Sequence, residues 1–230
     1  MKSMIRNLLV CTALGAVVNL NAQTVTVDPA TLTLAYMNWT PTAYTLANYP
    51  GGGGTGSSGW SLAAAPATFS GTQLTLSPNV NTYAAGNAYW TNPDGTGANQ
   101  MDASVYNETT GTYVGTTLTF TGDVLANTFA SGYNTYAFIK DFVSNYSSST
   151  TQNILLTTPG VFSISLLTSA NVGDHIQYGF ETYGPNANPA TVAGLGSITI
   201  DAAPAPEPTT LALAGLGGAA ALSLIRRRKV

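Results

Sequence analysis

The sequence predicts an all-β protein whose body is an antiparallel β-sandwich of the jelly-roll type, with a signal helix before it and a transmembrane helix after it. Three observations predict the sandwich. Apolar and polar residues alternate in short runs through residues 23–203, clusters of Gly, Pro, Asn and Asp separate the runs, and no run has the length, caps and period of a helix. About ten short strands with one polar face fit two packed sheets. A parallel β-helix is the alternative, but no repeat period supports it.

Each strand is predicted from its own alternation of side chains. In residues 116–122, for example, Leu118 and Phe120 fall on one face and polar residues on the other. The predicted strands are residues 24–27, 31–39, 72–77, 88–90, 101–106, 116–122, 135–142, 153–156, 160–168, 175–182 and 196–201. The predicted separators are residues 48–59, 91–100, 107–111 and 183–190. The whole of 23–203 is expected to form one domain.

Residues 1–22 have the order of a secretory signal peptide: a positive start, an apolar stretch at 8–18 and a small residue, Ala22. This apolar stretch is too short to cross ~30 Å of hydrocarbon at ~1.5 Å per residue, so we expect cleavage near Ala22 rather than a permanent anchor. Cys11, the chain's one cysteine, lies inside this peptide. The mature chain then has no cysteine, which excludes disulfide bonds and thiolate catalysis.

The charge of the body excludes one large class of function. Between residues 23 and 205 the chain has nine carboxylates, one lysine (Lys140) and no arginine. Nucleic-acid binding depends on clustered Lys and Arg that neutralise phosphates. The body cannot supply such a cluster, so we expect no nucleic-acid partner.

The C-terminal tail has three parts, which are a proline-rich joint at 204–210, an apolar run at 211–225 and a closing cluster of cations. The residues concerned are Pro206, Glu207 and Pro208 in the joint, and Arg226, Arg227, Arg228 and Lys229 in the cluster. The cations are expected on the cytoplasmic side as a membrane stop. With an export signal at the other end of the chain, this places the body outside the cell and the apolar run across the membrane as a helix.

This order of Pro-Glu-Pro, apolar span and arginine cluster over residues 204–230 resembles the PEP-CTERM protein-sorting signal, which is also named the ice-binding protein C-terminal domain. That name describes the tail and says nothing of ice binding by the body. The resemblance implies recognition and cleavage by a membrane-embedded exosortase. It also implies a precursor anchored in the inner membrane and a product at the cell surface or outside the cell.

The body is similar to mature regions of PEP-CTERM proteins of Verrucomicrobia-type bacteria. The segments that carry this similarity are residues 117–129, 137–142 and 176–190. The similarity implies a galactose-binding-like or jelly-roll sandwich.

Candidate catalytic residues in the body are few. His175 is the chain's one histidine and begins a predicted strand, which favours a structural or surface role over a triad or a zinc site. Glu108 and Glu181 are the body's two glutamates, and a pair of carboxylates is the minimum for glycoside hydrolysis. Glu181 is out of phase with the apolar face of its strand and is expected to face solvent. We therefore expect no enzyme, no catalytic residue and no cofactor.

Two weaker candidates concern ligand binding. The loop at 92–102 carries four oxygen-bearing side chains that are candidates for calcium, although a plain Asx-rich turn is favoured because the spacing of an EF-hand is absent. These four are Asn92, Asp94, Asn99 and Asp102. The tryptophans Trp39, Trp60 and Trp90 are candidates for stacking on sugar rings, although core packing is favoured because large aromatics dominate β cores.

The sequence as a whole predicts an exported, exosortase-processed protein without catalytic activity, with a structural or adhesive role at the cell surface or in the exopolysaccharide matrix of a biofilm. The alternative is a carbohydrate-binding module that binds extracellular polysaccharide. A polysaccharide-active enzyme is a remote alternative.

Overall fold

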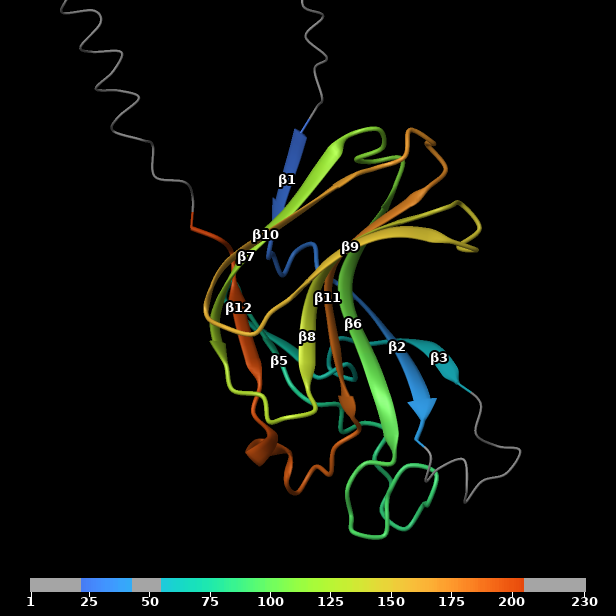
Figure 1. The fold of residues 1–230 in the computed structure, drawn as a ribbon, viewed down its shortest axis with the longest axis vertical. Helices are drawn as coiled ribbons and strands as arrows, with labels where there is room; N and C mark the ends of the chain where they lie inside the picture. The colour runs from blue at the N-terminus through green and yellow to red at the C-terminus, as the bar shows by residue number, and fades with distance from the viewer. Residues whose placement is uncertain (1–21, 43–54, 205–230) are drawn as a thin grey trace, which may run out of the picture.

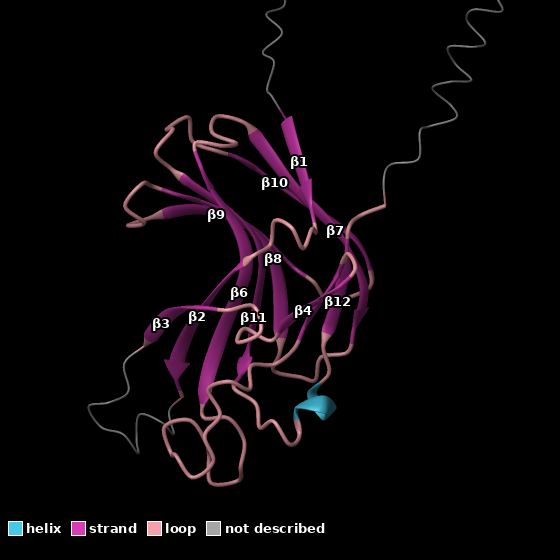
Figure 2. Cartoon of the chain, turned by 180° about the vertical axis from the view of Figure 1, so that it is seen from behind, coloured by secondary structure: helices cyan, strands magenta, loops and turns pink. Residues whose placement is uncertain are grey.

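The computed structural model describes residues 22–42 and 55–204, which form two six-stranded sheets packed face to face (Figure 1). The predicted all-β sandwich is confirmed, and its jelly-roll type stays a prediction. Within the described residues the one helix is a short 3-10 turn, Val192–Leu195, drawn in cyan in Figure 2. The predicted signal helix, the apolar run at 211–225, the Pro-Glu-Pro residues and the cation cluster lie outside the described residues.

Sheet A is built around one long strand, β7. The strands are β1 (Ala22–Thr26), β4 (Ala67–Ser70), β5 (Gln73–Leu76), β7 (Thr117–Asn127), β10 (Gly160–Leu167) and β12 (Ile198–Asp201). β10 runs antiparallel along one edge of β7. The other edge of β7 is divided between two strands. β1 lies parallel opposite residues 117–121, and β12 lies antiparallel opposite residues 123–127. The sheet then continues from β12 through β5 to β4.

Sheet B is antiparallel throughout, in the order β3-β2-β6-β11-β8-β9. The strands are β2 (Leu34–Pro41), β3 (Gly56–Trp60), β6 (Asn99–Thr110), β8 (Asn134–Phe142), β9 (Ser149–Leu155) and β11 (His175–Pro185). Gly179 sits in the middle of this sheet, directly opposite Tyr106 on β6 and Phe138 on β8. A Cβ atom at this position would lie 2.1 Å from the Val105 carbonyl oxygen, so the close approach of β11 to β6 requires glycine.

The core lies between the two sheets and is centred on Phe120 of β7. Its ring is fully buried, and its centroid lies 5.3 Å from those of Tyr178 and Phe180 on sheet B and 5.6 Å from that of Phe162 on β10. These residues are the apolar members of the alternations predicted for 116–122, 160–168 and 175–182. Since one face of each sheet is used here, the other face of each sheet points away from this core.

Two strands differ from the prediction because tertiary pairing, and not local pattern, makes them. β3 lies inside the glycine-rich stretch 48–59, which we expected to be a separator. Its Gly56 lies against the ring of Trp39 on β2, and an added Cβ would be 1.9 Å from a ring carbon. β4, a short edge strand paired with β5, was not predicted either.

Other predicted elements also differ from the structure. β11 runs to Pro185, into the expected separator at 183–190, and β9 begins at Ser149 and not at residue 153. β6 continues through residues 107–110, which were expected to be a turn, because it pairs with β11 as far as Thr110. Residues 88–90, which were expected to form a strand, lie in turns instead.

Candidate functional site

The outer face of sheet B carries a groove of about 520 Å³, which is within the range of ligand sites in proteins. We call it the sheet B groove. Its lining residues come from β2, β6, β8, β11 and the β8–β9 turn, and they are Tyr36, Asn38, Ser104, Tyr106, Glu108, Lys140, Phe142, Tyr146 and Gln177. They are mainly aromatic rings, amides and charged groups.

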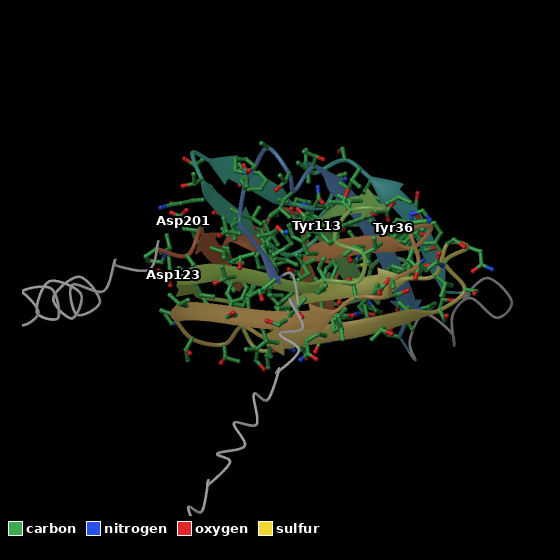
Figure 3. The ribbon with its side chains drawn as sticks, turned by 90° about the horizontal axis from the view of Figure 1, so that it is seen from above. Tyr36, Tyr113, Asp123 and Asp201 are labelled. Carbon is green, nitrogen blue, oxygen red and sulfur yellow. The ribbon has the colours of Figure 1, made fainter. Side chains whose placement is uncertain are left out.

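The alternation of each strand places these residues on the outer face. On β6, Ala103 and Val105 point into the protein, so Ser104, Tyr106 and Glu108 point away from it. The ladder register then aligns groups from neighbouring strands, for example Glu108 of β6 with Gln177 of β11 and Lys140 of β8. In Figure 3, Tyr36 lies on the side of the molecule away from Asp123 and Asp201 of sheet A.

Tyr146 closes one end of the sheet B groove from the β8–β9 turn. It has a positive φ of 58°, a conformation that costs a non-glycine residue roughly 1–2 kcal/mol. Its ring stacks on that of His175, with centroids 4.2 Å apart and planes within 8°, and its hydroxyl donates to Glu108 Oε1 at 2.9 Å. Partial desolvation, and then the hydrogen bond to Glu108, raise the pKa of Tyr146 to about 12, so the hydroxyl stays a donor. These contacts hold the ring in place against the backbone strain.

His175 itself is held by two hydrogen bonds. Its Nε2 faces the Ser144 carbonyl oxygen at 3.1 Å and its Nδ1 faces the Thr110 hydroxyl at 2.8 Å. A carbonyl can only accept, so Nε2 carries a proton. The structural role that the sequence favoured for this residue agrees with these contacts.

Glu108 is the acidic group of the sheet B groove. In addition to the bond from Tyr146 to Oε1, its Oε2 accepts a hydrogen bond from Gln177 Nε2 at 2.5 Å. Both donors are neutral. The two hydrogen bonds therefore fix the orientation of the carboxylate, but neither partner neutralises its charge.

Glu181 corrects a prediction. It lies on the outer side of β11, as its phase indicated, but it is only 4% exposed and does not face solvent. It forms an ion pair with Lys140 of β8, whose Nζ also lies 4.4 Å from the centroid of the Phe138 ring. The outer face is covered here by its own long side chains, which an alternation pattern cannot reveal.

Asp102 lies one row from this ion pair, opposite Tyr183 in the ladder. Burial, and then the charge of Glu181, raise the pKa of Asp102 to about 6, although Asn38 Nδ2 donates to its Oδ2 at 3.2 Å. The same two carboxylates, after burial, raise the pKa of Tyr183.

We expect this carboxyl group to make stability depend on pH. The pKa of Asp102 in the folded state lies above its unfolded value of 3.8, so the folded state binds the proton more tightly. The stability that Asp102 contributes is therefore complete below pH 3.8 and is lost as pH rises through about 6. From about pH 4 to pH 7 the free energy of unfolding of the wild type should fall by roughly 2 kcal/mol relative to that of Asp102→Asn. Urea unfolding of both proteins across this range measures the difference. Parallel curves would show that Asp102 titrates normally.

The C-terminal tail matches a known protein-sorting motif. Residues 204–229 match the model of the PEP-CTERM protein-sorting motif. The chain carries a PEP-CTERM sorting signal. This signal implies an exported protein that is processed by an exosortase and reaches the cell surface from a membrane-anchored precursor. Among curated proteins and solved structures, none matches the chain.

The PEP-CTERM match covers the tail, so the body must be interpreted from its own geometry. The similarity of the body to PEP-CTERM proteins of Verrucomicrobia-type bacteria stays a prediction. Among residues 22–42 and 55–204, no helix is both long and apolar enough to span a membrane.

The four calcium candidates are used in different places. Asn92 and Asp94 stabilise their own turn, since Asn92 Nδ2 donates to the Gly97 carbonyl at 2.9 Å and Asp94 Oδ1 accepts from the backbone N–H of Thr96 at 2.9 Å. Asn99 is buried and donates to the Tyr89 carbonyl, whereas Asp102 lies on the outer face of sheet B. The described part of the chain has no group of three or more His, Cys, Asp or Glu residues placed to hold a metal ion. The contacts agree with an Asx-rich turn.

The three tryptophans lie at one end of the sandwich, half-buried against the buried pair Met37 and Met101. Trp39 and Trp90 have ring centroids 6.0 Å apart, and Trp39 Nε1 donates to the Tyr89 hydroxyl at 3.1 Å. None of the three lines the sheet B groove. Sugar stacking by a tryptophan stays a prediction. The groove tyrosines were missed. Tyr106 already stood out of phase with the apolar residues of its predicted strand, whereas Tyr36 is in phase with Leu32 and Leu34 and gave no such signal.

Proposed function

We propose that this exported PEP-CTERM protein is a non-catalytic adhesive protein of the cell surface or exopolysaccharide matrix that binds polysaccharide in the sheet B groove. The observation that carries the proposal is the set of aromatic rings on one sheet face, interleaved with amides and a carboxylate. Sugar rings have an apolar face that packs on aromatic rings and hydroxyls that need hydrogen-bond partners. The sheet B groove offers both kinds of contact side by side.

Four rings supply the apolar contacts, from Tyr36, Tyr106, Phe142 and Tyr146. Tyr36 and Tyr146 are the more accessible of the four, at 36% and 48% exposure. Asn38, Ser104 and Gln177 supply amide and hydroxyl groups between them. A groove on one sheet face, without a closed cavity, suits a long chain better than a small molecule.

The arrangement of the carboxylates supports a binding role over an enzymatic one. Glu181 is buried and paired with Lys140, which leaves it poorly placed to act on a sugar. Glu108 is fixed by two hydrogen bonds in the groove wall. A polysaccharide-active enzyme remains the remote alternative, and it requires turnover that disappears in Glu181→Gln.

Truncation of Tyr36 should weaken binding to a soluble polysaccharide by about tenfold, because a stacked ring contributes about 1 kcal/mol beyond the area it buries. The fold should survive, since the Tyr36 side chain is 36% exposed and its hydroxyl bonds to Ser57, itself exposed, at 2.9 Å. The measurement is affinity electrophoresis of the purified full-length chain in detergent, in gels that contain a range of neutral, amino and acidic polysaccharides.

The matched control is Leu167→Ala, which removes a side chain that is 62% exposed on β10 of the other sheet. It should leave retardation in the gels unchanged. Trp60→Ala distinguishes the tryptophan alternative. If it abolishes binding while Tyr36→Ala does not, the ligand lies at the tryptophan end and the proposed site is wrong. Absence of binding to every polysaccharide would contradict a glycan-binding role altogether.

A further inference from the structure

The sheet B groove has a charge that is not balanced by the protein. Lys140 is the only Lys or Arg among residues 22–204, and it is paired with Glu181. The other carboxylates in this part of the chain therefore have no lysine or arginine within residues 22–204 with which to pair. Three of the carboxylates, Asp102, Glu108 and Glu181, lie on the outer face of sheet B.

Glu108 is the one of these that lines the sheet B groove. Tyr146 and Gln177 each donate one hydrogen bond to it, which leaves further lone pairs on both oxygens for a ligand. A carboxylate accepts strong, charge-assisted hydrogen bonds from an ammonium group. Its neutral partners orient it for such a bond without neutralising it.

The surrounding rings favour the same kind of ligand. Tyr146, which bonds to Glu108, and Phe142 both line the sheet B groove, with ring centroids 5.6 Å apart. Aromatic faces attract cations as well as the apolar faces of sugars. An anionic polysaccharide, by contrast, would bring like charge to a face with three carboxylates and one paired lysine, and such contacts are unfavourable.

We propose that the sheet B groove selects polysaccharides with free amino groups, such as de-N-acetylated hexosamine polymers, and that Glu108 is the counter-charge for one ammonium group. This inference rests on the proposed function, because it names the class of glycan that the same groove binds. Glu108 is then a specificity-determining residue. The aromatic rings supply the contacts that any hexose polymer would share.

The test compares short soluble oligosaccharides of glucosamine and of N-acetylglucosamine, which differ only in the acetyl group, with a uronic acid oligosaccharide as the anionic case. Calorimetric titration of the full-length chain should show binding of the glucosamine oligomer about tenfold tighter than that of its acetylated form, and none of the uronic acid oligomer. Glu108→Gln keeps the shape of the side chain and should remove this tenfold preference. Rising salt concentration should weaken glucosamine binding alone.

Asp94→Asn is the matched control, since it removes a carboxylate from a turn outside the sheet B groove and tests whether the net acidity of the chain attracts the amine. An equal loss of preference in this variant would overturn the role of Glu108. Equal affinity of the wild type for the two hexosamine oligomers would overturn the amine preference and leave the proposed glycan site standing. Binding of neither oligomer, nor of any other polysaccharide, would overturn the proposed function itself.

Discussion

Phe120→Ala should lower the free energy of unfolding by about 3–5 kcal/mol, the largest effect that we expect from a single truncation in this protein. The ring is fully buried and contacts three other aromatic rings, those of Phe162, Tyr178 and Phe180, which come from both sheets. Its removal leaves a cavity that rigid neighbours on two sides cannot fill. For a body of this size the midpoint of thermal unfolding should fall by roughly 10 °C.

The control for this prediction is Leu125→Ala on the same strand. Leu125 points away from the core and is 41% exposed, so its truncation should change the unfolding free energy by about 0.5 kcal/mol or less. Urea unfolding monitored by circular dichroism measures both variants. Similar losses in the two would mean that the sheets do not pack around Phe120 in the way described here.

Lys140→Met should destabilise the fold by about 2–3 kcal/mol, because it leaves the Glu181 carboxylate buried without its partner. The expected loss lies below that for a fully buried pair, since the Lys140 side chain is 20% exposed. Glu181→Met should cost a similar amount for the reciprocal reason, as it strands the ammonium group above the Phe138 ring.

The double variant Lys140→Met/Glu181→Met is the decisive measurement for this pair. Once both charges are gone, no charge is left buried without a partner, so the double variant should be more stable than either single one. The coupling energy from the double-mutant cycle should be at least about 2 kcal/mol. Additive losses would show that the two groups do not interact in solution.

Much of the fold could be predicted because the strands that form the core carry their own pattern. β7, β10 and β11 alternate strictly, and their apolar residues meet around Phe120 as that pattern requires. β3 could not be predicted in this way, because the glycine and serine residues in its sequence indicate a loop. It becomes a strand because it pairs with β2, and its Gly56 leaves room for the Trp39 ring. In such a strand the decisive contacts come from residues distant in the sequence.

The sheet B groove was less accessible to sequence reasoning than the fold. A pattern of period two shows that Tyr106 leaves the core, but residues 31–39 have apolar side chains in both phases and leave the direction of Tyr36 open. The pattern also does not show that the tyrosines share one face with Glu108 and Gln177, because that depends on the order and register of the strands. The contact of Tyr146 with His175 depends on the path of a turn. The tail was predictable since its three parts are contiguous in sequence.

The shared edge of β7 has a mechanical consequence. β12 has hydrogen-bonded neighbours on both sides, β7 and β5, and Ala203 N–H donates to Thr26 Oγ1 of β1 at 3.3 Å just beyond its end. Because β1 occupies the rest of that edge, the chain must leave the sheet here, directly before the sorting signal. A pull along β12 from the tail would load both of its hydrogen-bond ladders in shear at once and would not open one pair after another. The strand nearest the sorting signal is therefore placed to resist a force that is applied through the tail.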